Sequence, residues 1–186
     1  KTADLLASGD RSPSHYLDEL EKSLTRAVVQ ESNADVPLGS FLSGGIDSSL
    51  ITALLQKHSD KKIETFTLGF DEKKYDESVY AKSVAKSIGT VHNELVVSPH
   101  DLNDIIPNLS CMFDEPFGDP SAIPTYVVSK FARSSVTVAL TGDGGDEIFG
   151  GYNHYQRANQ IWSTVKKIPA GARGLATLML SPVGKQ

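Results

Sequence analysis

Two glycines, three serines and one aspartate are packed into the seven residues from Ser43 to Ser49 (Ser-Gly-Gly-Ile-Asp-Ser-Ser). Glycine has no Cβ, so the backbone at Gly44 and Gly45 can turn sharply and approach a ligand closely. The segment leads from an expected strand into an expected helix, whose first turn offers unpaired N–H groups and the positive end of the helix dipole. The serine hydroxyls add donors, so this loop is predicted to bind phosphate oxygens mainly through neutral groups.

Asp47 does not fit a simple phosphate site, because a carboxylate repels a phosphate unless a cation lies between them. Magnesium resolves the conflict, since it takes hard oxygen ligands and bridges carboxylates to phosphates. The alternative is that Asp47 only caps the helix, a position that suits aspartate. The loop lacks the Gly-Lys-Ser/Thr ending of a Walker A motif and the spacing Gly-x-Gly-x-x-Gly, so neither of those nucleotide sites is indicated.

A second loop, Thr-Gly-Asp-Gly-Gly-Asp-Glu at 141–147, follows another expected strand. Asp143, Asp146 and Glu147 repel one another unless they are solvated or serve a cation. A solvated acidic loop is therefore the alternative, and the spacing does not match an EF-hand. If the first and fourth strands are neighbours, Asp47 and Asp146 can share one metal ion.

Strands alternate with helices along the chain, which predicts βαβ units. We expect strands at 36–42, 63–70, 91–97 and 135–142, and helices from Ser12-Pro13 to about residue 28 and at 47–57, 76–89, 99–113 (broken at Pro107), 121–133 and from 152 onward. Right-handed crossovers then give an α/β fold, a doubly wound parallel sheet with helices on both faces. Ligands of such sheets bind beyond the carboxyl ends of the strands, where both loops lie.

Composition argues against a nucleic-acid-binding protein and against a membrane-spanning one. The chain has 186 residues, 39% of them hydrophobic, and a net charge of −5, which argues against a broad nucleic-acid-binding face. No apolar run reaches the roughly 18 residues of a membrane span. The single cysteine, Cys111, is expected to be a buried core thiol, and a chain without a disulfide suits a reducing, cytoplasmic compartment. Because the chain starts at Lys1, we expect it to be a piece of a longer polypeptide.

Four segments in this order carry a resemblance: Leu-Ser-Gly-Gly-Ile-Asp-Ser-Ser (42–49), Thr-Phe-Thr-Leu-Gly-Phe with Tyr-Asp-Glu-Ser (65–70, 75–78), Asp-Glu-Pro-Phe-Gly-Asp-Pro-Ser-Ala-Ile-Pro (114–124) and Thr-Gly-Asp-Gly-Gly-Asp-Glu-Ile-Phe-Gly-Gly-Tyr (141–152). With them the chain resembles the synthetase domain of glutamine-dependent asparagine synthetases, within the PP-loop ATP pyrophosphatases of the adenine nucleotide alpha hydrolase-like fold. The β-lactam synthetases share these motifs. The resemblance implies a linker and leading helix at 1–35, an ATP-binding core at 36–155 and a truncated helical extension at 156–186.

The resemblance also implies a reaction and its site. ATP and Mg²⁺ are the expected cofactors, and the side-chain carboxylate of aspartate, or of a related acid, is adenylated with release of pyrophosphate before ammonia displaces AMP. Asp47 and Asp146 match the magnesium ligands, and Asp143 stands near the reacting amine, so these three acids are the expected catalytic residues. The pyrophosphate residues are Ser43, Gly44, Gly45, Ser48 and Ser49. The residues matching the adenosine wall are Phe41, Leu42, Leu68, Gly69, Thr141 and Gly142.

The chain departs from the family pattern at three points. Many members have Glu and Ser where this chain has Asp143 and Gly145. The glutaminase domain that would supply ammonia is absent, and no lysine matches the family's downstream catalytic lysine. Alternatives are therefore amidation of a polysaccharide or antibiotic acid, a tRNA-modifying PP-loop enzyme, and a nucleotide-binding fragment without turnover. We expect no membrane or nucleic-acid partner, and a homodimer of the full-length protein.

Overall fold

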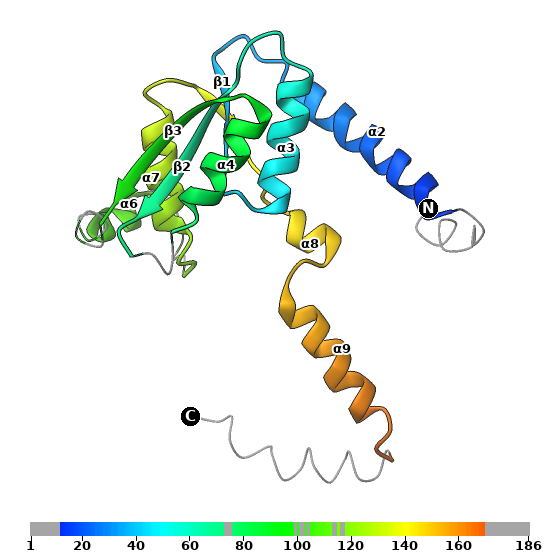
Figure 1. Cartoon of the computed structure of the whole chain (residues 1–186). Helices are drawn as coiled ribbons and strands as arrows, with labels where there is room; N and C mark the ends of the chain where they lie inside the picture. The colour runs from blue at the N-terminus through cyan, green and yellow to red at the C-terminus, as the bar shows by residue number, and fades with distance from the viewer. Residues whose placement is uncertain are drawn as a thin grey trace. The chain divides into compact units, whose positions relative to one another are not determined.

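The computed structural model describes residues 12–72, 76–98, 100, 103, 105–112, 115 and 118–169. The chain divides into two compact units, Lys1–Asp143 and Gly144–Gln186, and each is described by itself. The first unit holds the sheet and its covering helices (Figure 1), and the described part of the second unit, residues 144–169, holds two helices.

Four parallel strands form the sheet of the first unit. They are β1 (Leu38–Phe41), β2 (Glu64–Phe70), β3 (Val91–Val97) and β4 (Val138–Leu140), in the order β3-β2-β1-β4. The condition set for a shared site after the first and fourth strands is met, since β1 and β4 are neighbours and Ser40 lies opposite Leu140 in a parallel register. All strands point the same way, so the loops after β1 and β4 leave the same edge of the sheet.

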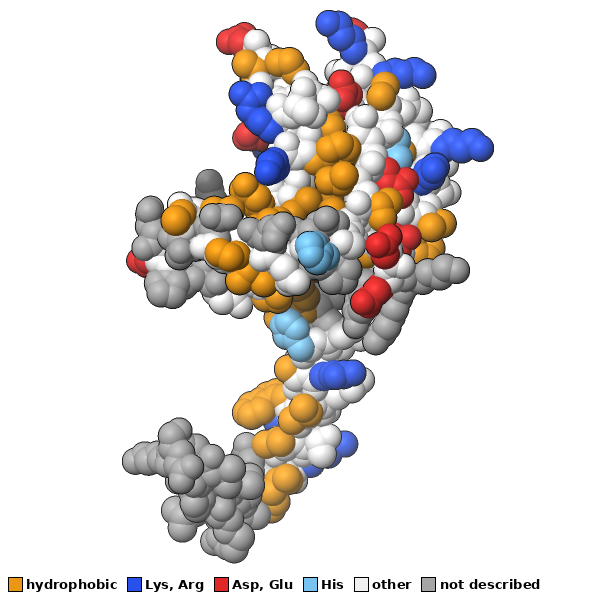
Figure 2. All heavy atoms as spheres, turned by 90° about the vertical axis from the view of Figure 1, so that its left-hand side faces the viewer, with side chains coloured by type: hydrophobic (Ala, Val, Ile, Leu, Met, Phe, Trp, Pro, Cys, Tyr) orange, Lys and Arg blue, Asp and Glu red, His pale blue; other side chains and the backbone are white. Residues whose placement is uncertain are grey.

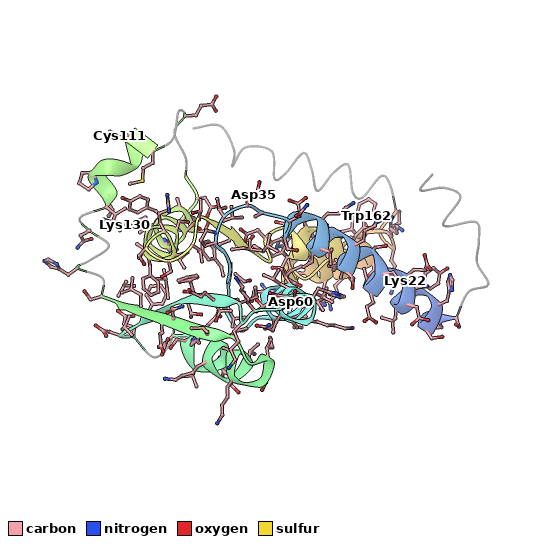
Figure 3. All side chains as sticks on the ribbon, turned by 90° about the horizontal axis from the view of Figure 1, so that it is seen from above. Lys22, Asp35, Asp60, Cys111, Lys130 and Trp162 are labelled. Atoms are coloured by element: carbon pink, nitrogen blue, oxygen red, sulfur yellow. The ribbon has the colours of Figure 1, made fainter. Side chains whose placement is uncertain are left out.

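Helices cover both faces of this sheet, as predicted. The helices α3 (Ile46–Lys57) and α4 (Ser78–Ile88) pack on one face, and α7 (Ala122–Ala132) packs on the other; Figure 3 shows the strands between α4 and α7. Alternation along β2 explains the two layers. Phe66 makes an edge-to-face contact with Phe131 of α7 at a centroid distance of 5.6 Å, whereas Thr67 points to the other face and donates to the carbonyl of Leu42.

The leading helix α2 (Pro13–Glu31) begins where predicted, since Ser12 caps it by accepting a hydrogen bond from the N–H of His15 at 3.4 Å. The apolar residues that recur at helical spacing along this helix are buried only in part. Val28 and Leu24 pack with Leu54 and Leu55 of α3, but Leu17 remains 65% exposed. The helix therefore contributes to the core through its carboxyl-terminal half.

The segment predicted to be a broken helix at 99–113 is described in part. It contains a 3₁₀ turn, η1 (Ile106–Asn108), with Pro107 inside it, followed by the one-turn helix α6 (Leu109–Met112). Cys111 lies on α6 and is exposed, so the expected core thiol is wrong (Figure 3). A single helical turn has no continuous apolar face to bury, and the side chain remains at the surface.

The described part of the second unit contains α8 (Gly145–Phe149) and α9 (Asn153–Val165), neither of which contains a buried residue. The sequence predicted α9 but treated 145–149 as loop. Tyr155, Ile161 and Trp162 of α9 are exposed, and Figure 2 shows apolar side chains gathered along one side of this helix. Among the described helices, none is both long and apolar enough to span a membrane.

Candidate functional site

The serine–glycine loop, residues 43–49, starts directly at the end of β1. The N–H of Leu42 donates to the carbonyl of Phe66 at 3.0 Å, and this is where the chain leaves the sheet. Gly44 then adopts a φ of +83°, in the left-handed region that favours glycine. A Cβ at Gly44 would stand 2.6 Å from the backbone N of Ala81. Position 44 therefore requires glycine for two reasons: the positive φ of the turn and the close contact with the first turn of α4.

Two serine hydroxyls hold this loop in its shape. Ser48 Oγ accepts a hydrogen bond from the N–H of Ser43 at 3.2 Å and donates to the carbonyl of Gly45 at 3.3 Å. Ser43 Oγ lies 3.0 Å from Ser48 Oγ and accepts from the N–H of Gly45 at 3.2 Å. These bonds fold the loop around the amino end of α3, so its shape does not depend on a bound ligand.

The first turn of α3 presents donors without helical partners. The first helical hydrogen bond is donated by Ser49 to Gly45 at 3.1 Å, so the N–H groups of Ile46, Asp47 and Ser48 precede the ladder. Ser49 Oγ is shut off from solvent and has no partner within the described residues. An anion placed at this turn would meet several N–H groups and the positive end of the helix dipole.

Asp47 is not the cap of α3, so the capping alternative is wrong. Gly45 occupies the N-cap position with an extended backbone, φ −69° and ψ 165°, and no side chain makes a cap hydrogen bond. A cap must stand before the helix, whereas Asp47 is already inside its first turn. Within the described residues its half-buried carboxylate makes no hydrogen bond or ion pair. This carboxylate is therefore free to serve a cation.

The loop after β4 meets the serine–glycine loop at Gly142. A Cβ on Gly142 would lie 2.6 Å from the backbone N of Ser48 and 2.9 Å from the backbone carbonyl carbon of Asp47. Thr141 Oγ1 accepts a hydrogen bond from the N–H of Asp143 at 3.2 Å and so turns the chain at this point. Two segments far apart in the sequence thus come into backbone contact at the carboxyl edge of the sheet.

The expected adenosine wall lies at the carboxyl halves of the strands and in the β4 loop. Phe41 ends β1, Leu68 and Gly69 lie in β2, and Thr141 follows β4. Leu42 is only 1% exposed and packs with Ala81 and Ala85 of α4. Its side chain therefore belongs to the core, its N–H is already bonded to Phe66, and a ligand could reach only its carbonyl, which already accepts from Thr67.

Two acids of the second loop, Asp146 and Glu147, lie in the second unit. Asp146 and Glu147 stand in the first turn of α8, after Gly144 with a φ of +85°. The carbonyl of Asp146 accepts from the N–H of Gly151 at 3.0 Å, and a Cβ on Gly151 would overlap the Asp146 carboxylate.

Glu147 also has a partner, which the sequence pattern did not reveal. The Tyr152 hydroxyl donates to Glu147 Oε1 at 2.7 Å. This hydrogen bond lowers the pKa of Glu147 below its ordinary value and raises the pKa of Tyr152 to about 12. Glu147 is thus held by its own unit, whereas the sequence alone had placed it with the two aspartates.

Two further acids have turn-forming roles. Asp76 accepts from the N–H of Ser78 at 3.1 Å at the start of α4, and hydrogen bonds from the Ser78 hydroxyl and N–H lower the pKa of Asp76. Asp119 accepts from the N–H of Ser121 at 2.8 Å, which likewise lowers the pKa of Asp119. The spacing Asp-x-Ser before a helix is a local signal that could have identified both turns. Asp114, in the third motif, lies outside the described residues.

Within the described ranges, no three or more His, Cys, Asp or Glu side chains form a group that could hold a metal ion. A magnesium ion bound together with a nucleotide needs fewer protein ligands, because phosphate oxygens and water complete its coordination around one or two carboxylates.

Comparison with known proteins places this arrangement in a family. The family model described as asparagine synthase matches residues 19–186. Two relatives carry asparagine synthetase (glutamine-hydrolyzing) in their names: one from Methanocaldococcus jannaschii is 43% identical over 154 residues, 82% of this chain and 30% of that protein, and one from Bacillus subtilis is 40% identical over 160 residues, 84% of this chain and 25% of that protein. The chain thus spans less than a third of the length of these relatives.

A solved structure supports the fold alone. The NH3-dependent NAD synthetase from Campylobacter jejuni aligns with a TM-score of 0.50 at 11% sequence identity, over 73% of this chain and 60% of that one. Its shared architecture is that of the PP-loop, adenine nucleotide alpha hydrolase-like fold. With the parallel sheet, the two loops that meet at Gly142 and the match over residues 19–186, the chain belongs to the asparagine synthase family.

Proposed function

We propose that this chain is the ATP-binding part of an amide-forming synthetase that adenylates a carboxylate and passes it to ammonia. The contact between Gly142 and the first turn of α3 carries the proposal. It joins a loop rich in neutral donors to a loop that leads into two carboxylates, at the edge of a parallel sheet where ligands bind. Membership of the asparagine synthase family supports the same reaction class.

ATP would lie across the carboxyl edge of the sheet. Its adenosine would meet Phe41, Leu68 and the backbone of Leu42, Gly69, Thr141 and Gly142, in keeping with a largely apolar wall and a few backbone donors. The β- and γ-phosphates would occupy the serine–glycine loop. There the free N–H groups of the first turn of α3 and the unpartnered Ser49 hydroxyl favour an anion.

Asp47 and Asp146 are the proposed magnesium ligands. Asp47 fits this role because its carboxylate has no partner within the described residues, and a first-turn carboxylate beside a phosphate site needs a cation. When bound, magnesium would neutralise charge on the leaving pyrophosphate. Asp47 and Asp146 would hold the cation, and the N–H groups of the first turn of α3 would meet phosphate oxygens.

The proposed acceptor is the side-chain carboxylate of aspartate. An oxygen of that carboxylate would form a bond to the α-phosphorus as the bond to pyrophosphate breaks, and ammonia would then form the amide bond as AMP leaves. Asp143, exposed in the β4 loop, is proposed to face the reacting amine. In this scheme catalysis comes mainly from positioning and charge neutralisation. The names of the two relatives describe those proteins as glutamine-hydrolyzing, and we propose that glutamine hydrolysis outside this chain would supply the ammonia.

Calorimetric titration of this chain with ATP, with and without magnesium, tests the binding step. We expect ATP binding that depends on magnesium and that Asp47→Asn abolishes. Asp60→Asn is the matched control, because Asp60 is an exposed aspartate just beyond the other end of α3. ATP binding unaffected by Asp47→Asn would refute the metal-ligand role. In the full-length protein, pyrophosphate release should require aspartate and free ammonia, and its absence would refute the proposed reaction.

A further inference from the structure

A buried pair of hydroxyl groups in the core connects the serine–glycine loop and the β4 loop. Ser40 of β1 and Thr52 of α3 are both 0% exposed, and their hydroxyl oxygens lie 2.9 Å apart. Thr52 Oγ1 donates to the carbonyl of Ser48 at 2.7 Å, so the hydrogen of Ser40 Oγ is shared between Thr52 Oγ1 and the carbonyl of Leu140 at 3.2 Å. One pair thus contacts the first turn of α3 and the last residue of β4.

These contacts close a ring. Leu140 leads through Thr141 to Gly142, Gly142 abuts the backbone N of Ser48, and the carbonyl of Ser48 returns through Thr52 and Ser40 to Leu140. Ser48 is therefore held from both sides of its peptide unit. The ring spans the point at which the serine–glycine loop and the β4 loop meet.

The chemistry of the pair gives this ring its rigidity. Each hydroxyl carries one hydrogen: that of Thr52 goes to Ser48, and that of Ser40 is shared between Thr52 Oγ1 and the carbonyl of Leu140, with the carbonyl of Phe41 farther off at 3.5 Å. Neither side chain is exposed to water that could replace a lost partner. Removing the Thr52 hydroxyl would take its side-chain donor from the carbonyl of Ser48 and break the link from α3 through Ser40 to β4, so β4 would be freer to shift against α3.

We propose that Ser40 and Thr52 are positioning residues that set the separation of the two loops, and hence the width of the site for the triphosphate of ATP. The inference rests on the proposed function for its consequence in binding, but the ring itself does not depend on a ligand. The two hydroxyls contact the backbone carbonyls of Ser48 and Leu140 and none of the N–H groups proposed to bind phosphate. Their effect on ATP binding would therefore pass through the backbone.

Thr52→Val tests the proposal, because valine keeps the shape of threonine and lacks its hydroxyl. We expect a roughly tenfold higher dissociation constant for magnesium ATP in calorimetry, about what the loss of one buried hydrogen bond gives. Amide hydrogen exchange should become faster in both loops. Thr52→Ser restores the hydroxyl and should return both readouts to within about twofold of the parent chain, since a lost methyl group does not break the ring.

Thr65→Val is the matched control. Thr65 is also a threonine at 0% exposure with hydroxyl contacts, but these run to Thr90 and His92 at 3.1 Å each, outside the ring. It should lower the melting temperature while leaving the ATP affinity and the exchange of the loops unchanged. Equal loss of affinity in Thr65→Val and Thr52→Val would show general loosening and overturn the proposal.

The two measurements separate this inference from the proposed function. If the parent chain binds no ATP, the proposed function fails, and hydrogen exchange alone decides whether the ring couples the loops. If the parent chain binds ATP and Thr52→Val binds equally well with unchanged exchange, the positioning role is refuted. Should Thr52→Val not fold, Ser40→Ala removes the other hydroxyl of the pair and should give the same faster exchange in both loops.

Discussion

Replacing Gly142 with alanine should separate the two loops directly. The added Cβ would stand 2.6 Å from the backbone N of Ser48, and both this atom and the backbone of Asp47 at 2.9 Å belong to the main chain and cannot rotate away. Relief requires a shift from 2.6 Å to the 3.4 Å at which ordinary contact begins, a displacement of about 0.8 Å. The β4 loop would move away from α3 by this amount.

A displacement of this size has two expected costs. Crowding of a packed contact typically lowers stability by about 1–3 kcal/mol. A misplacement of about 1 Å in a site that acts by positioning can cost on the order of a hundredfold. We therefore expect Gly142→Ala to weaken magnesium-dependent ATP binding by roughly 10- to 100-fold, measured by calorimetry, and to lower the urea midpoint modestly.

Gly39→Ala controls for crowding away from the loops. A Cβ at Gly39 would meet the carbonyl oxygen of Glu64 and a ring carbon of Phe66, each at 2.9 Å, in the body of the sheet. This variant should lose stability but keep its ATP affinity. If Gly142→Ala binds ATP like the parent chain, or if Gly39→Ala weakens binding as much, the contact at Gly142 does not set the geometry of the site.

Three further predictions address other parts of the chain. Gly44→Ala should destabilise the first unit in urea titrations, because its φ of +83° disfavours alanine and a Cβ would stand 2.6 Å from the N of Ala81; an unchanged midpoint would contradict this geometry. Burial lowers the pKa of His92 in the folded chain below 6.5. Between pH 6.5 and this lower folded value, the unfolded chain binds more protons than the folded chain. The free energy of unfolding that is present above pH 6.5 is therefore reduced as the pH falls through this range. The urea midpoint should therefore drop more on acidification in the parent chain than in His92→Gln, and parallel curves would disprove it. Tyr152→Phe removes the hydroxyl that donates to Glu147 and should raise the pKa of that carboxyl, as followed by carboxyl NMR shifts; an unmoved titration would mean that the hydrogen bond does not form in solution.

The order of elements and the place of the loops could be predicted from local pattern. β3 spans Val91–Val97 as expected, and the helix expected to end at residue 89 is closed there by Gly89 with a φ of +87°. These features depend on residues close together in the chain, such as a run of β-formers or a glycine after a helical face. The short helix α8 was missed because its glycines and acids look like loop residues, although Gly144 and Gly150 in left-handed conformations bound a single turn.

Burial was harder to predict than secondary structure. The apolar spacing of α2 indicated one continuous buried face, yet Leu17 is exposed because α3 covers only the carboxyl-terminal half of α2. Cys111 was expected in the core and lies on an exposed single turn. Whether an apolar residue is covered depends on which element crosses it, and the sequence around that residue does not contain this information.

For the site, the sequence by itself determined the chemistry. The glycines, serines and Asp47 specify a loop that can hold an anion and a cation, because residue type and spacing alone fix the donors, the charge and the freedom of the backbone. Only the tertiary structure decided what holds the loops together. Parallel pairing of β1 with β4 brings Gly142 against Ser48, and the buried Ser40–Thr52 pair closes the ring beneath them. Such contacts join residues that are distant in the chain, and each forms only when the sheet has set the register that makes them neighbours.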